Sequence, residues 1–167
     1  MSIYRIQGPW AGLLAIVSRP RGGDWLDDEV LAWKNAGLDV IVSLLTKEED
    51  NELDLTDEER ACEKFGLRFF QFPIADVSIP TSREAAFELV NELERLLARG
   101  RGVGIHCRQS VGRSGIIAAC ILVLSGSAPE EALKNVSNAR GVIVPQTDEQ
   151  RDWVIGFARE FAPAAAR

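Results

Sequence analysis

Histidine, tyrosine and cysteine are scarce in this sequence of 167 residues, which has one histidine, one tyrosine and three cysteines. The three cysteines, Cys62, Cys107 and Cys120, lack the spacing of metal ligands, and a single histidine adds little to them. The composition therefore argues against a zinc site, and we expect neither a metal nor another cofactor.

Long hydrophobic runs are also missing. The N-terminus has no basic region followed by a signal-type apolar run, since residues 13–17 are only long enough for a strand. We therefore expect a cytoplasmic protein with no membrane partner.

Basic residues are outnumbered by acidic ones, and the formal charge is -6. This balance argues against nucleic-acid binding by bulk electrostatics. A local basic rim formed by Arg19, Arg21 and Arg108 could still steer an anionic substrate. For Arg19 and Arg21, ordinary solvated loop charge is an equally good interpretation.

The length and the 46% hydrophobic content suit one domain, residues 1–167, with a frayed tail at 162–167. Apolar runs predict strands at 3–6, 13–17, 38–45, 67–72 and 103–107. Helical patterns at 26–36, 56–65, 82–99 and 113–124 alternate with them, and two further helices follow. Capping boxes are expected at Thr56/Glu59, Thr81/Glu84, Ser127/Glu130 and Thr147/Gln150. The alternation predicts an α/β fold with a mainly parallel sheet of about five strands flanked by helices, and we favour a monomer.

The most informative segment is HCRQSVGRSG, residues 106–115, which joins a buried strand to an apolar helix. A helix N-terminus presents unpaired N–H groups and a positive dipole, so an anion in this turn meets several donors. Gly112 can take backbone angles that let the loop curl, and the planar fork of Arg113 matches two phosphate oxygens. The expected phosphate cradle comprises Arg108, Gln109, Ser110, Val111, Gly112 and Arg113.

The same positive field favours the thiolate form of Cys107 and makes it a candidate nucleophile. A buried structural thiol is the alternative, and the loop context argues against it. Since His106 points to the opposite side of its strand, a Cys–His pair is disfavoured, and a hydrogen-bonded core histidine that orients the loop is preferred. Ser114 could cap the helix, hydrogen-bond the sulfur, or do both.

This segment resembles the signature loop of the cysteine-dependent protein tyrosine and dual-specificity phosphatases, with a cysteine, five residues, an arginine and a serine. The similarity extends from about residue 26 to 157 and is greatest to compact bacterial members and the kinase-associated dual-specificity type. Residues 72–80 resemble the general-acid loop of that family, with Asp76 as the proton donor. Residues 144–150 resemble its glutamine loop. The resemblance implies a phosphatase-type fold.

Local alternatives remain for the two flanking segments. Asp76 lies between two prolines, so its residue type alone would suggest a turn aspartate. Gln146 and Gln150 alone would be helix-start residues, with Gln150 in a capping box. With the resemblance added, Gln146 is expected to hold the hydrolytic water, and Gln150 ranks as a supporting residue.

The resulting hypothesis is hydrolysis of phosphate monoesters on a protein or peptide through a phosphocysteine, with Cys107, Arg113, Asp76, Ser114 and Gln146 as catalytic residues. Phosphotyrosine is the expected substrate, with phosphoserine and phosphothreonine as further candidates. The only tyrosine, Tyr4, lies in the first strand, which favours a shallow, dual-specificity cleft. Trp25 could form a wall, although anchoring the next helix in the core is preferred.

Three alternatives stay open. One is a phosphatase for a phosphoinositide or another non-protein monoester. The second is a phosphate-binding adaptor without catalysis. The third is another thiol enzyme that uses an anion-binding loop, such as an arsenate reductase or a sulfurtransferase. An enzyme of either kind would not require Asp76 or the glutamines.

Overall fold

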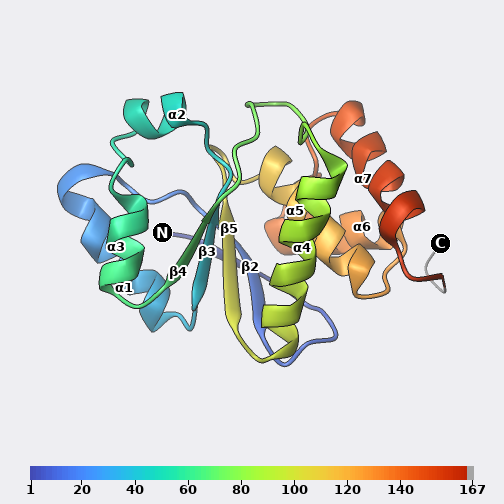
Figure 1. Ribbon diagram of the computed structural model, residues 1–167, viewed down its shortest axis with the longest axis horizontal. Coiled ribbons are helices and arrows are strands. Elements are labelled where there is room, and N and C mark those ends of the chain that lie inside the picture. The colour runs from blue at the N-terminus through green and yellow to red at the C-terminus, as the bar shows by residue number, and fades with distance from the viewer. Residues whose placement is uncertain (165–167) are drawn as a thin grey trace.

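The computed structural model describes residues 1–164. At its centre is one sheet of five strands in the order β1-β2-β5-β3-β4 (Figure 1). Its strands are β1 Ile3–Ile6, β2 Leu13–Val17, β3 Val40–Ser43, β4 Arg68–Gln71 and β5 Gly102–His106. β1 is antiparallel to β2, and the other pairs are parallel. The expected mainly parallel sheet is confirmed.

Helices cover both faces of the sheet. They are α1 Leu26–Asn35, α2 Lys47–Glu52, α3 Glu58–Lys64, α4 Arg83–Ala98, α5 Gly112–Leu124, α6 Pro129–Arg140 and α7 Asp148–Phe161, with a 3-10 turn at Gly23–Trp25. Figure 1 shows α1 and α3 on one side of the sheet and α4, α5, α6 and α7 on the other. The expected arrangement of helices on both sides of the sheet is therefore present.

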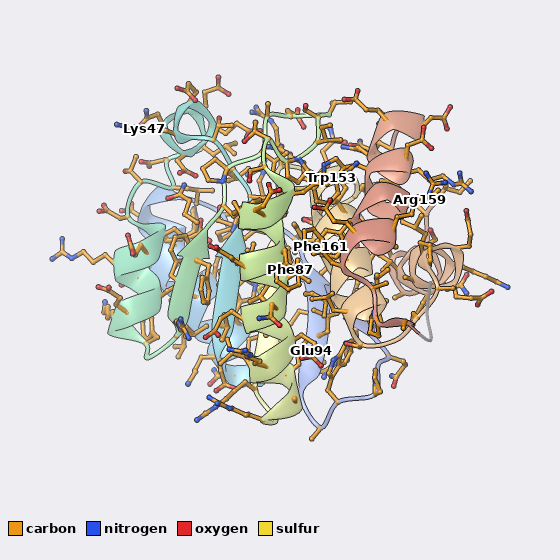
Figure 2. All side chains as sticks on the ribbon, turned by 45° about the vertical axis from the view of Figure 1, so that its right-hand side comes forward. Lys47, Phe87, Glu94, Trp153, Arg159 and Phe161 are labelled. Carbon is orange, nitrogen blue, oxygen red and sulfur yellow. The ribbon has the colours of Figure 1, made fainter. Side chains whose placement is uncertain are left out.

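The alternation of side chains along each strand separates two hydrophobic cores. Leu14 and Ile16 of β2 enter the larger core beneath α4–α7, whereas Ala15 and Val17 enter the smaller core beneath α1 and α3. On the larger side, Phe87 of α4 stacks on Phe161 of α7 with ring centroids 4.5 Å apart, and Figure 2 shows the two rings between these helices. This packing fixes α7 relative to the centre of the sheet.

The topology brings the ends of four parallel strands to one edge. β5 lies between β2 and β3, so the segment that follows it emerges in the middle of that edge. The segments that follow β2, β3 and β4 emerge beside it. Ligands of open α/β sheets bind at this carboxyl edge.

Several helix starts differ from the predicted capping boxes. Thr56 does not cap α3, because the N–H of Glu58 bonds to the carbonyl of Leu55 in a backbone turn. At α4 the cap is Ser82, one residue later than predicted, and its hydroxyl accepts from the N–H of Ala85.

Two more caps were predicted near the C-terminus. Ser127 does not cap α6, since Pro129 at the first helical position already has the backbone angle of a helix. The cap at Thr147 is confirmed, because its hydroxyl accepts from the N–H of Gln150. The side chain of Gln150 does not complete that box, and its amide oxygen accepts from the N–H of Gln146 instead.

The helix α2 is absent from the predicted elements. This helix has six polar residues and lacks the apolar repeat that marks a longer helix. Thr46 and Glu49 form a reciprocal capping box at its start, with each side chain accepting from the backbone N–H of the other. Glu49 is thereby held with its backbone and side chain both fixed.

The C-terminal end is packed as far as it is described. Ala162, which was assigned to the frayed tail, is buried, and its N–H bonds to the carbonyl of Ala158. Residues 165–167 of the expected tail lie outside the described residues. Within residues 1–164, no helix combines the length and apolar character needed to cross a membrane.

Candidate active site

The loop after β5 begins with Cys107, whose side chain is buried in the larger core. Ser110 has a positive φ of 56°, and its hydroxyl donates to the carbonyl of Val17 at the end of β2 over 2.6 Å. The loop is thus tied to the neighbouring strand. Among the described residues, the backbone N–H groups of 108–111 donate to no protein acceptor, so they remain able to bind an anion.

Arg140, at the end of α6, contacts the same loop from outside. Its guanidinium donates to the carbonyls of Ser110 over 2.8 Å and Gln109 over 3.3 Å, and it lies 4.2 Å from the ring centroid of Tyr4. A trans peptide places its C=O and N–H on opposite sides. Because two carbonyls point to Arg140, the N–H groups of Ser110 and Val111 point away from it. Sequence reasoning missed Arg140, since it lies thirty residues from Ser110.

Arg113 is almost completely buried, with 1% of its surface exposed. Its two terminal nitrogens hold Glu49 in a bidentate pair, with Nη1 2.6 Å from Oε2 and Nη2 2.9 Å from Oε1. Nη1 also donates to the carbonyl of Ile74 over 2.8 Å, and Nη2 to Oδ1 of Asp76 over 2.9 Å. Within residues 1–164, Nε has no hydrogen-bond partner. One edge of the fork is therefore fixed by Glu49, and the edge containing Nε is left for an anion.

The charges in this group stabilise one another. Burial disfavours charged Arg113, but the hydrogen bonds that it donates to Glu49 and the negative charges of Cys107, Glu49 and Asp76 outweigh it and raise the pKa of Arg113. Burial likewise opposes ionised Glu49, but hydrogen bonds from Arg113 and the backbone of Thr46, with the charges of Arg113 and Arg108, lower its pKa. Both side chains therefore stay charged at neutral pH.

Asp76 lies in the loop after β4, at the mouth of the site. Its side chain is half exposed, and Oδ1 accepts from the N–H of Val77 over 3.0 Å as well as from Arg113. Val77 has a positive φ of 56° and an exposed side chain. The expected proton donor and the expected anion-binding arginine are in direct contact.

Both glutamines lie against the start of α5. A Cβ on Gly112 would be 2.4 Å from Oε1 of Gln146 and 2.9 Å from Nε2 of Gln150. A side chain at position 112 would therefore displace the amide ends of both glutamines. The loop's left-handed residue is Ser110, so the conformational reason expected for Gly112 was wrong. The amide of Gln150 also donates to the carbonyl of Ser78 over 2.9 Å and so joins the acid loop to the glutamine loop.

His106 and Ser114 flank the loop. Nε2 of His106 is 2.6 Å from Oε1 of Glu58, and both side chains are buried. The ring of His106 also stacks on Trp33 on the side of the smaller core. Ser114 does not cap α5, because the capping position is Val111 and has no side-chain bond. Its hydroxyl is buried without a hydrogen-bond partner in the described residues.

The remaining predicted residues lie at the rim or in the core. Arg108 is partly exposed and donates to Glu52 over 3.0 Å. Trp25 is 54% exposed, so the preferred interpretation as a core anchor was wrong, and its ring instead faces the guanidinium of Arg21 at 4.3 Å. Cys62 and Cys120 are buried free thiols, with Cys62 in the smaller core and Cys120 in the larger one.

A family model described as "Polymorphic toxin system, DSP-PTPase phosphatase" matches residues 15–127. The chain belongs to this phosphatase family. The matched residues include Cys107, Arg113 and Asp76 but end before the glutamine loop.

Curated relatives of the family are similar over part of their length. The chain is 28% identical to rat cyclin-dependent kinase inhibitor 3 over 131 residues, which are 77% of this chain and 61% of that protein. Human cyclin-dependent kinase inhibitor 3 is 29% identical over 131 residues, which are again 77% of this chain and 61% of that protein. The chain thus spans about three-fifths of the length of these relatives.

Solved structures are similar over nearly the whole chain. Kinase associated phosphatase, with its catalytic-site cysteine replaced by serine, has a TM-score of 0.88 at 22% identity and covers 96% of both chains. Tk-PTP in its active form has a TM-score of 0.73 at 28% identity and covers 95% of this chain and 97% of its own. The first of these comparisons establishes the fold alone.

Proposed function

We propose that this protein hydrolyses phosphate monoesters on proteins through a phosphocysteine intermediate. The observation that carries the proposal is the arrangement around the guanidinium of Arg113. Glu49 holds its two terminal nitrogens, Asp76 accepts from Nη2, and Nε is left for an anion. The cysteine loop beside it has unpaired backbone N–H groups. Family membership supports the same activity.

In the first step, the Cys107 thiolate attacks phosphorus in line with the ester oxygen. The sulfur–phosphorus bond forms as the phosphorus–oxygen bond breaks, and protonated Asp76 gives its proton to the departing oxygen. The loop N–H groups and Arg113 stabilise the charge on the three equatorial oxygens throughout. The products are the free alcohol, the phosphocysteine and the Asp76 carboxylate.

In the second step, water attacks the phosphocysteine. Asp76 takes a proton from that water, the sulfur leaves as thiolate, and inorganic phosphate is released. We assign the positioning of this water to Gln146, because its amide oxygen lies against Gly112 at the start of α5. Ser114, buried without a hydrogen-bond partner, is assigned to hydrogen-bond the departing sulfur.

A phosphorylated protein is the substrate class we favour. The names of two similar proteins, a cyclin-dependent kinase inhibitor and a kinase associated phosphatase, support a protein partner. We extend the proposal to phosphothreonine and phosphoserine as well as phosphotyrosine, since the only tyrosine of the chain, Tyr4, lies in β1 against Arg140, and a shallow cleft follows from the lack of a tyrosine wall. Because the reaction needs a reduced thiol, we place it in the cytoplasm.

The test uses purified protein with a chromogenic aryl phosphate, in the presence and absence of a chelator. We expect chelator-insensitive turnover that Cys107→Ser abolishes, while the variant still binds phosphate, because its hydroxyl cannot ionise at neutral pH. Turnover by Cys107→Ser within about tenfold of the wild type would exclude covalent catalysis by Cys107. Arsenate reduction or sulfur transfer without aryl phosphate hydrolysis would instead identify another thiol enzyme, and phosphate binding without turnover an adaptor.

A further inference from the structure

A second group of arginines lies directly beside the signature loop. The segment after β2 and the segment after β5 meet there, because these parallel strands end at the same edge and Ser110 is bonded to Val17. Together they line a depression of about 320 Å³, which we call the arginine pocket, formed by Ser18, Arg19, Arg21, Arg108, Gln109 and Ser110. No acidic residue lines it, although the chain has a formal charge of -6.

The three arginines keep donors free for a ligand. Arg19 has no ion-pair partner among residues 1–164. Arg21 bonds to Glu29 through Nε and Nη2, which leaves Nη1. Arg108 bonds to Glu52 through Nη1, which also lies 3.8 Å from Oε1 of Glu49, and its Nε and Nη2 remain. The side chains of Arg21 and Arg108 are 59% and 36% exposed. The exposed pair of Arg108 with Glu52 is weak, and Glu29, whose side chain is 8% exposed, orients Arg21 while leaving its Nη1 available to an added anion.

Trp25 lies outside the lining of this pocket but holds one of its arginines in place. Its exposed ring lies 4.3 Å from the guanidinium of Arg21, while Glu29 holds that guanidinium from another direction. Contact with an aromatic face and a carboxylate restricts the rotamers of a long side chain. Arg21 is therefore oriented before a ligand binds. This contact also accounts for the exposed position of the Trp25 ring.

We propose that the arginine pocket binds a second anionic group, a phosphate or a carboxylate, on the peptide whose phosphoresidue occupies the signature loop. This inference rests on the proposed phosphatase function and specifies its substrate. Arg108 directly follows Cys107 in the chain, so the pocket adjoins the reacting centre. An extended peptide advances about 3.3–3.6 Å per residue, which brings an acidic or phosphorylated neighbour one or two positions away within reach.

A peptide fits better than a lipid headgroup. The chain carries an excess of negative charge, which opposes approach to an anionic membrane surface, whereas a flexible peptide segment approaches the basic pocket alone. Phosphate and carboxylate share the geometry that the arginine fork recognises, so both are covered by the proposal.

The experiment compares kcat/KM on three peptides of one sequence: with phosphotyrosine alone, with an added phosphoserine two positions away, and with glutamate at that position. We expect kcat/KM of the wild type to be about tenfold higher for the doubly phosphorylated peptide than for the peptide with phosphotyrosine alone. The increase for the glutamate peptide should be smaller. Arg19→Gln/Arg21→Gln should abolish this preference and leave turnover of the singly phosphorylated peptide within about threefold. Arg99→Gln, a matched exposed arginine at the end of α4 on the opposite edge, should retain the preference.

Two further measurements make the outcome decisive. The preference should decline as salt is raised, since exposed charges are screened. Binding of the same peptides to Cys107→Ser gives a readout without turnover, so loss of the proposed catalysis would not conceal the pocket. Equal kcat/KM and equal binding for all three peptides, or a preference that survives the double substitution, would overturn the proposal. An arginine-dependent preference for a bisphosphorylated inositol headgroup over these peptides would overturn the assignment to a peptide.

Discussion

Nη2 of Arg113 donates to Oδ1 of Asp76 over 2.9 Å, so the two groups assigned to bind phosphate and to supply the proton share one hydrogen bond. A phosphate that binds the free Nε and the adjoining Nη2 competes with Asp76 for the same N–H. Binding of the substrate therefore frees the Asp76 carboxyl at the position where the leaving oxygen is to be protonated.

This competition predicts opposite effects on binding and rate in Asp76→Asn. Removal of the negative charge should tighten the binding of vanadate or phosphate severalfold, whereas kcat on phosphotyrosine should fall by about 10²- to 10⁴-fold, the usual yield of general acid catalysis. The loss should be smaller for an activated aryl phosphate, whose leaving group departs without a proton. Asp148→Asn, at the first position of α7, is the control. Equal rate losses on both substrates with unchanged anion affinity would make Asp76 a turn residue.

Glu49→Gln tests the fixed edge of Arg113. Because the pKa of Glu49 is lowered in the folded protein, its carboxylate stabilises the fold above about pH 4.5, the ordinary value, and this contribution disappears as the pH falls through the folded pKa. At pH 7 the substitution should lower the free energy of unfolding by about 2–3 kcal/mol, and the difference should shrink below pH 4.5.

Denaturant melts of Glu49→Gln, the wild type and the exposed neighbour Glu48→Gln over a range of pH measure this effect. Glu48→Gln should unfold like the wild type at every pH. We also expect kcat/KM of Glu49→Gln to fall by tenfold or more, about 1.4 kcal/mol in transition-state binding, because the guanidinium loses its orientation. A stability difference that does not depend on pH would show that packing, and not the ion pair, is what Glu49 supplies.

The three thiols should differ in reactivity. Burial, with the negative charges of Glu58, Glu59 and Glu63, raises the pKa of Cys62, and burial raises that of Cys120. Both therefore stay protonated and inert at neutral pH, since the thiolate is the reactive form. Iodoacetamide should modify Cys107 first, and phosphate should slow that reaction. Peptide mass spectrometry identifies the labelled residue, and denatured protein, in which all three react, is the control. Early labelling of Cys62 would contradict the expectation.

Gly112→Ala should slow the second chemical step more than the first. The added Cβ would displace the amide ends of Gln146 and Gln150, which are flexible enough for the fold to accommodate the change. A burst of alcohol release followed by slow turnover, seen by rapid quench, would reveal accumulated phosphocysteine. If the effect acts through Gln146, Gly112→Ala should add little to Gln146→Ala. Additive losses, or no burst, would assign the defect to the loop itself.

Much of this arrangement follows from local sequence patterns. The buried run of residues 103–107 and the apolar run after Gly112 placed the signature loop between β5 and α5, because periodicity and helix-start signals act over a few residues. Leu38 and Leu45 were predicted within a strand, but only Val40–Ser43 is paired. Burial alone therefore extended the predicted strand by a residue or more past the paired segment at each end.

What could not be predicted depends on distant pairs. Glu49 lies 64 positions from Arg113 and in a helix too short and polar to be recognised. Arg140 approaches the loop from a different helix, and Trp25 faces Arg21 on the surface where its size suggested a core position. Such contacts arise from the packing of whole elements, and no spacing in the sequence records them.

The two chemical steps of the proposed mechanism depend on different segments of the chain. The segment matched by the family model, residues 15–127, holds every group that the proposed mechanism uses to move the phosphoryl group onto sulfur. The group assigned to position the acceptor water, Gln146, together with its neighbour Gln150 and the Arg140 contact, comes from α6, α7 and the turn between them. In this scheme, the choice between water and another hydroxyl as the final acceptor belongs to the last third of the fold. Substitutions there could turn a hydrolase into a phosphotransferase without altering its nucleophile.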